Sequence, residues 1–334
     1  MRSKRRNFWR DQSGAISVAS AIVFALCLGF AALVVDLAHL YVVKGELQRN
    51  ADAAALAGAR GLWPNNLNPP DPTPVSRPYV PYYSTAADRA LSTATSVNNQ
   101  VNGAALAAGD VTVDVGNWNY CTKVFTPVQD TTTNGVRVTA RKSGVTNLFG
   151  KVLRSTPMNL TATAIAVMDA AKEVGYGTLP IAISKNFINS SDNLPINFTP
   201  DINDTGGWFT DPPDPANAKT IKDYIVNDSC PALQIGDIIN LSNGQVATDI
   251  QALMDELAVH LAAGQEGWDV FLPVVDTDKF NQSQPIISFV PYRIKQIDKN
   301  HGITQGQILN MGEAGNAEPG GTNTGTMAPP KLVL

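Results

Sequence analysis

Charge is scarce in this chain of 334 residues, since Asp, Glu, Lys and Arg make up only 16% of it and the formal net charge is -4. What basic charge there is gathers at one end. The first ten residues carry Arg2, Lys4, Arg5, Arg6 and Arg10 and contain no acid. A basic cluster confined to one terminus does not make a nucleic-acid-binding surface, so no nucleic-acid partner is expected.

Histidine and cysteine are also rare, with three of each. His39, His260 and His301 have no Cys or His at the spacing of metal ligands, so no zinc site is predicted. The sequence lacks a Gly-x-Ser-x-Gly elbow, a Walker loop and a His-Glu-x-x-His helix. We therefore expect a protein that is not an enzyme, without catalytic residues, metal or cofactor.

Two Asp pairs are the remaining candidates for a cation site. Asp201 with Asp204, and Asp276 with Asp278, could offer the oxygen ligands that Ca²⁺ prefers. Asp is also common in turns, where its side chain bonds the nearby backbone. We favour a turn-forming role for both pairs.

No charged residue occurs between Gly14 and Val35. A helix of this length spans the roughly 30 Å hydrocarbon core of a bilayer. The basic cluster before it and Asp36 after it place the N-terminus in the cytoplasm and the rest of the chain outside. Because the apolar region of a cleaved signal peptide is usually only ~7–15 residues, we expect a retained single-pass anchor, with cleavage as the alternative.

Residues 36–62 contain no proline and place Leu residues near helical spacing, so the membrane helix is expected to continue outward. Ala51, Ala54, Ala55 and Gly58 fall three and four residues apart, which puts them on one stripe. Such small side chains allow another element to approach closely. The neighbour is either the protein's own domain or another subunit, including a second copy of the chain.

The remaining sequence predicts two folded units. Residues 63–85 are Pro-rich and should form a loop. A membrane-proximal α+β domain over 86–170 is predicted from helices over 86–108 and 145–153 and from alternating, strand-like runs over 110–118, 135–142 and 159–168. A distal, mostly β domain over 178–304 is predicted from strands over 179–187, 236–245, 268–276 and 285–298 and a helix over 248–264.

Three smaller features complete the pattern. The Gly-, Asn- and Thr-rich tail over 311–334 should be flexible, although 331–334 could add a final strand. Gly207, Trp208 and Phe209 could belong to a binding surface. Cys27 lies within the apolar run, which leaves Cys121 and Cys230 as a possible disulfide in an oxidising compartment, subject to strict geometry.

The segment from Gly14 to Gly61 resembles the N-terminal part of TadE/TadG-like proteins of the Tad (tight adherence) machinery, which builds Flp-type pili. The resemblance rests on the runs SGAISV, VVDLAHLY and LQRNADAAALAGA, and a weaker similarity continues through NGVRVTARK, NLFGKVL and LTATAIAVM.

This resemblance implies a non-enzymatic assembly or structural component of a Tad/Flp-type pilus or related secretion apparatus. Such a component would be anchored in the inner membrane with its bulk in the periplasm, and would contact the lipid bilayer and other pilus-assembly or secretion proteins. An exported, adhesin-like binding module and a membrane-anchored enzyme are the alternatives.

Two features of related proteins are missing. Prepilin-type processing at Gly14 would call for Glu five residues further on, where this chain has Ala19. The Asp-x-Ser-x-Ser metal motif of von Willebrand A-type domains is reduced to the fragment Asp11-Gln12-Ser13.

Overall fold

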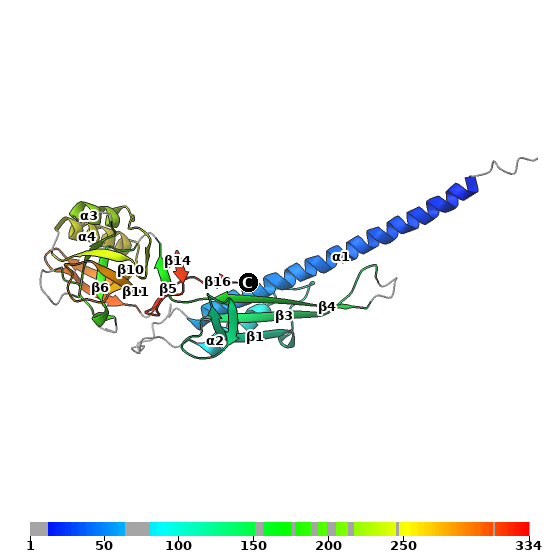
Figure 1. Ribbon diagram of the computed structural model, residues 1–334, viewed down its shortest axis with the longest axis horizontal. Helices are drawn as coiled ribbons and strands as arrows, with labels where there is room; N and C mark the ends of the chain where they lie inside the picture. The colour runs from blue at the N-terminus through cyan, green and yellow to red at the C-terminus, as the bar shows by residue number, and fades with distance from the viewer. Residues whose placement is uncertain are drawn as a thin grey trace, which may run out of the picture.

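A computed structural model describes residues 13–63, 81–150, 156–175, 178–188, 193–198, 205–212, 217–244, 247–309 and 311–333. The molecule is elongated: a long helix runs from the N-terminal end into a first body, and a second body lies at the far end (Figure 1). The expected α+β class is confirmed, with a long N-terminal helix, antiparallel strands and a mostly β distal part.

Helix α1 (Ser13–Leu62) runs without a break through the position where the apolar sequence ends. Its Ala- and Leu-rich second half has no proline and a high intrinsic helix propensity. This half packs against helix α2 (Tyr83–Ala94) and the first sheet. The indole of Trp63, next after α1, donates a hydrogen bond of 2.8 Å to the carbonyl of Met168 and so ties the end of α1 to that sheet.

Helix α2 ends well before the predicted boundary at residue 108. The buried side chain of Asn50 on α1 donates hydrogen bonds of 2.8 Å to the carbonyls of Ala94 and Asn99. The first bond satisfies a backbone acceptor that the end of α2 leaves open, and the second holds the loop that follows. The chain then turns through Asn102 and Gly103, which have φ values of 54° and 73°, so the predicted helix over 86–108 is too long.

The first sheet is antiparallel, with strand order β16-β4-β3-β1-β2. Its strands are β1 (Val111–Asn119), β2 (Val124–Pro127), β3 (Gly135–Val145), β4 (Met158–Val167) and β16 (Lys331–Leu332), and η1 (Ala108–Asp110) precedes β1. The three strands predicted here are confirmed. The helix predicted over 145–153 is wrong in its described part, because β3 extends to Val145 and a turn follows at 148–150. Residues 151–155 lie outside the described residues.

The core of the first body lies between this sheet and the two helices. Alternate residues of β3 and β4 point to the same face, and those on the helix side are small and apolar. Val136, Val138 and Ala140 of β3, with Ala162 and Ala164 of β4, are buried there. Small side chains on both sides let α1 approach the sheet closely.

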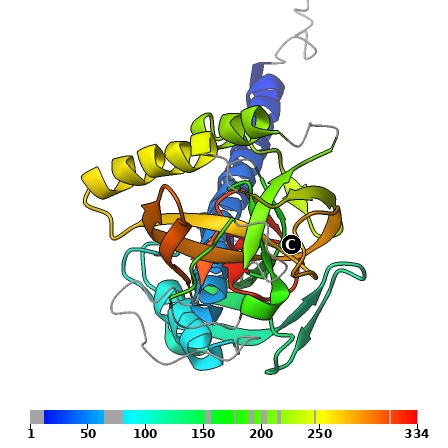
Figure 2. The same cartoon turned by 90° about the vertical axis from the view of Figure 1, so that its left-hand side faces the viewer.

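The second body is built around six strands in the order β10-β6-β7-β9-β11-β12, and a further pairing of β10 with β11 closes a ring. The strands are β6 (Ile181–Ser184), β7 (Gly206–Thr210), β9 (Ile238–Ser242), β10 (Trp268–Val275), β11 (Gln284–Asp298) and β12 (Gly302–Ile308), and η2 (Lys185–Phe187) follows β6. Helices α3 (Ala218–Val226) and α4 (Ala247–Ala262) lie side by side on one side of them (Figures 1 and 2). Helix α3 was not predicted.

The C-terminal segment returns from the second body to the first, and the flexible tail expected over 311–334 is therefore corrected. In its described part, β14 (Ala317–Pro319) pairs with β5 (Ala171–Val174), which pairs with β8 (Leu233–Gln234). β13 (Gly312–Glu313) pairs with β15 (Thr326–Met327), and β16 pairs with β4 as the expected final strand. Arg60 of α1 reinforces the return by an ion pair of 2.7 Å with Glu313.

Candidate functional site on helix α1

The first half of α1 is an exposed apolar cylinder. In the part of the chain that the structure describes, α1 is the one helix long and apolar enough to cross a membrane, and none of its most apolar window is buried. Its large exposed side chains are Ile16, Val18, Ile22, Val23, Phe24, Leu26, Leu28, Phe30, Leu33, Val34 and Val35. A soluble protein rarely exposes so extensive an apolar surface, which indicates a membrane or protein contact.

The second half of the same helix is core. Ala51, Ala54 and Ala55 have no exposed surface, and Gly58 is also buried. A Cβ placed on Gly58 would lie 2.9 Å from Cβ of Ala90 on α2. The small-residue stripe therefore packs against α2 and the first sheet of its own chain, which is the first of the two alternatives left open by the sequence.

The two halves meet at Asp36, whose side chain is only 6% exposed. Its two carboxylate oxygens accept hydrogen bonds from consecutive backbone N–H groups in the turn after β3: Phe149 at 2.9 Å and Gly150 at 2.7 Å. A buried carboxylate is costly unless it is hydrogen-bonded, and two donors offset that cost. The sequence marked Asp36 only as the end of the apolar run; its contact with a turn more than a hundred residues away had no local signal.

The two cysteines considered for a disulfide do not form one. Cys121 is an exposed, free thiol in the turn between β1 and β2. Cys230 is fully buried in the core of the second body, among Phe209, Tyr224 and Leu233. Neither cysteine is in a disulfide, so the possible pairing is not realised.

Among the candidate cation ligands, Asp276 and Asp278 are engaged in contacts with side chains that follow β6 or end it. Asp276 forms an ion pair of 2.5 Å with Lys185, and Asp278 accepts hydrogen bonds from Ser184 and from Asn186. Asp201 and Asp204 lie outside the described residues. Among the residues that the structure describes, no group of three His, Cys, Asp or Glu side chains is placed to hold a metal ion.

The histidines are placed separately. His39 lies partly exposed on α1, and His301 bonds Asp298 at 2.6 Å. His260 stacks on Trp268 with 5.4 Å between ring centroids and bonds Gln265 at 2.7 Å.

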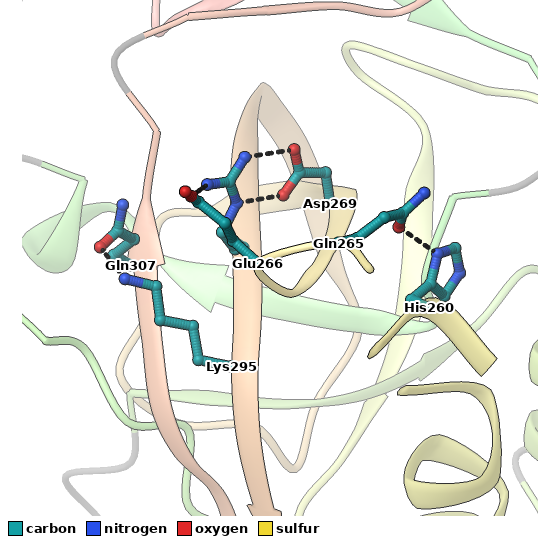
Figure 3. Close-up of polar contacts among 7 residues, drawn as sticks. His260, Gln265, Glu266, Asp269, Lys295 and Gln307 are labelled. Atoms are coloured by element: carbon teal, nitrogen blue, oxygen red, sulfur yellow. Dashed lines mark hydrogen bonds and ion pairs between the residues drawn. The ribbon is translucent and has the colours of Figure 1, made fainter. Parts of the chain in front are cut away.

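The second body carries a surface ion-pair cluster (Figure 3). Arg293 on β11 bridges Asp269 on β10 at 2.6 Å and Glu266 just before that strand at 2.7 Å. The hydrogen bonds to Asp269 raise the pKa of the Arg293 guanidinium and keep it charged. Lys295 bonds Gln307 of the adjacent strand β12 at 2.9 Å. These contacts join neighbouring strands on an exposed face and do not converge on a cleft.

A partly buried polar group lies where the first body joins the second, and the sequence did not reveal it. Asp169, just after β4, accepts hydrogen bonds from Asn134 at 2.9 Å and from the backbone of Ala170 at 2.8 Å. Burial raises the pKa of Asp169, and burial together with this carboxylate raises the pKa of Tyr120. The group fixes the chain at the end of the first sheet.

Gly207, Trp208 and Phe209, proposed from sequence as a binding surface, are instead core. All three are buried on β7, and Trp208 stacks on Phe198 with 4.1 Å between ring centroids. A buried aromatic pair cannot present itself to a ligand, so this support for an adhesin-like module is withdrawn.

Comparison with known families agrees with the resemblance seen in the sequence. Residues 14–61 match the family described as Flp pilus-assembly TadE/G-like, and residues 50–166 match the family described as Tad-like Flp pilus-assembly. Asp36 falls in the first match and its partner turn at 148–150 in the second. No curated protein and no solved structure matches the chain. From residue 14 to residue 166, the chain is therefore similar to the two Tad-like Flp pilus-assembly families.

Proposed function

We propose that this protein is a membrane-anchored, non-enzymatic assembly or structural component of a Tad/Flp-type pilus or related secretion apparatus. One observation carries the proposal: α1 is a single helix whose first half is an exposed apolar cylinder and whose second half is the centre of a folded core. An unbroken helix couples the position of the folded body directly to the bilayer. That coupling suits a component that holds its partners at a set height above the membrane.

The charge pattern supports an orientation. The basic cluster before residue 14 favours a cytoplasmic N-terminus in the inner membrane, with both bodies in the periplasm. In this arrangement the membrane-proximal unit over 86–170 and the distal unit over 178–304 are joined by the returning C-terminal segment. The partners are the bilayer, other pilus-assembly or secretion proteins and a second copy of the chain.

Native Cys121 gives a direct test of this orientation, because it is an exposed thiol far beyond the apolar half of α1. A membrane-impermeant maleimide should label it in cells whose outer membrane is opened and whose inner membrane is intact. The Cys121→Ser variant should lose this label. Adding Ser3→Cys to that variant should restore labelling only after the inner membrane is opened. The opposite pattern at the two positions contradicts the orientation.

The assembly role is tested in the native host. Copurification of the full-length protein after cross-linking should recover pilus-assembly or secretion components, and a strain lacking the protein should lose pili or secretion until the wild-type gene is returned. The intact mass of the mature protein should include the apolar helix. Normal piliation and secretion without the protein would contradict the role, whatever its topology.

A further inference from the structure

The turn at 148–150 exposes two large apolar side chains beside the apolar half of α1. Leu148 is 59% exposed and Phe149 is 48% exposed, although both follow the strand β3, whose last residue Val145 is buried in the core. Isolated exposed apolar residues are ordinary. Two adjacent ones, held next to the last residues of an apolar helix, need a more specific explanation.

Asp36 fixes where this turn lies along α1. Its carboxylate accepts the N–H groups of Phe149 and Gly150, so the turn backbone sits within hydrogen-bond distance of a side chain one residue beyond the exposed apolar run. Successive backbone N–H groups that converge on an anion form a compact, directional contact. The turn is therefore held at the level of Asp36, and each of the two N–H groups has a carboxylate oxygen as its hydrogen-bond acceptor.

This level coincides with the edge of the hydrocarbon core. From Ile16 to Val35, α1 rises by about 30 Å at 1.5 Å per residue, which matches the thickness of that core. If these residues span it, Asp36 and the turn lie at the boundary with the headgroups. Apolar side chains placed at that boundary bury themselves among headgroups and the first acyl carbons. Leu37 and Tyr41, just beyond Asp36, are exposed there as well.

We propose that the turn at 148–150 is a second membrane contact, in which Leu148 and Phe149 enter the interfacial layer of the leaflet that faces the folded bodies while Asp36 holds the turn against α1. The inference rests on the proposed membrane span of α1. A lipid surface is the occupant because the two side chains continue the exposed apolar surface of the helix at the same height. Two attachment points, helix and turn, fix the tilt and rotation of α1 and thereby the orientation of the first body.

The test uses the full-length protein in nanodiscs whose lipids carry spin-label quenchers near the headgroup. Single-cysteine variants for an environment-sensitive fluorophore are made in a Cys27→Ala, Cys121→Ser, Cys230→Ala background. Phe149→Cys is the test position. Phe30→Cys reports the membrane span itself, and Val97→Cys, 72% exposed but beyond α2, reports the aqueous side. We expect blue-shifted, lipid-quenched emission at position 149, and unshifted, unquenched emission at position 97.

Positions 30 and 149 distinguish the membrane anchor from the second membrane contact. Quenching at position 30 without quenching at position 149 overturns the second contact and leaves the anchor intact. Absence of quenching at both overturns the anchor, and the second contact with it. Asp36→Asn, which leaves one acceptor for two N–H groups, should weaken quenching at position 149 without changing it at position 30; equal quenching would refute the holding role of Asp36.

A second measurement keeps the native cysteines and so does not depend on the multiple replacements. A photoreactive benzoylphenylalanine in place of Phe149 preserves an aromatic ring at the turn. On illumination in nanodiscs it should form adducts with lipid. Cross-linking to a second copy of the chain in place of lipid would show that protein covers the turn, and would overturn the proposal.

Discussion

Gly58 and Gly45 allow the packing of α1 to be tested with one chemical change at two positions of the same helix. A Cβ added at Gly58 would lie 2.9 Å from Cβ of Ala90, 3.0 Å from Cγ1 of Val136 and 3.1 Å from the carbonyl oxygen of Ala86. A Cβ added at Gly45 would meet nothing within 4 Å. The two variants Gly58→Ala and Gly45→Ala therefore differ in crowding and share the same gain in helix propensity.

The expected changes in stability follow from helix propensity and from crowding. Replacing Gly by Ala within a helix contributes ~0.8–1.0 kcal/mol of stability. Overpacking a close contact costs ~1–3 kcal/mol. At Gly58 the neighbours are a second helix and a sheet, so neither can retreat without disturbing the core. Gly45→Ala should stabilise the first body, and the difference between the two variants should equal the overpacking cost of ~1–3 kcal/mol.

Hydrogen exchange of α2 peptides, measured by mass spectrometry on the detergent-solubilised protein, reads this difference locally. Exchange in Gly58→Ala should be faster than in Gly45→Ala by roughly 5- to 150-fold, since each ~1.4 kcal/mol corresponds to a factor of ten. Equal protection of α2 in the two variants would refute the close approach of α1 to α2 and to β3.

Three further predictions concern the packing of the two cores and one buried carboxylate. Ala55→Leu should lower the free energy of unfolding by ~1–3 kcal/mol, whereas Ala53→Leu on the exposed side of the same helix should be nearly neutral in thermal unfolding. Burial raises the pKa of Asp249 to about 6 from 3.8, so its protonated form favours the fold, and stability should fall as pH rises from about 4 to about 6. Asp249→Asn should flatten that decline in a series of melting curves, and an unchanged slope would contradict the assignment. Trp208→Ala should cost ~3–5 kcal/mol as a cavity in the second core; an unaltered melting temperature would mean that the ring is not core.

The sequence alone was enough to predict the helices and strands whose apolar residues recur at regular spacing. The uncharged run to Val35 and the proline-free stretch after it predicted one long helix, and α1 is that helix. Alternating Val and Ala predicted β3 and β4, because a strand with one buried face needs that alternation. The stripe at Ala51 and Ala55 was also visible, yet the sequence could not say whether the surface facing it belonged to this chain.

Long-range contacts decided what local pattern could not. Helix α2 stops at Ala94, whose carbonyl accepts a hydrogen bond from the buried Asn50 of another helix, and the sequence near position 94 gives no sign of this contact. The tail looked flexible because its composition has no period, but its short strands complete the edges of sheets formed much earlier in the chain. Whether a segment forms a strand depends on the strand it pairs with. For the tail, those partner strands lie far away in the sequence, so the neighbouring residues do not reveal them.

Asp36 shows why the membrane boundary and the fold have to be considered together. The same carboxylate ends the apolar run and holds the turn at Phe149. One residue of α1 therefore marks both the proposed edge of the bilayer and the attachment of the first body. An α-helix advances 1.5 Å and turns by about 100° per residue. A residue inserted within the apolar half would therefore leave the contact at Asp36 intact and rotate the whole body over the membrane. A residue inserted between Asp36 and Asn50 would keep the span and break the alignment of turn, helix and core.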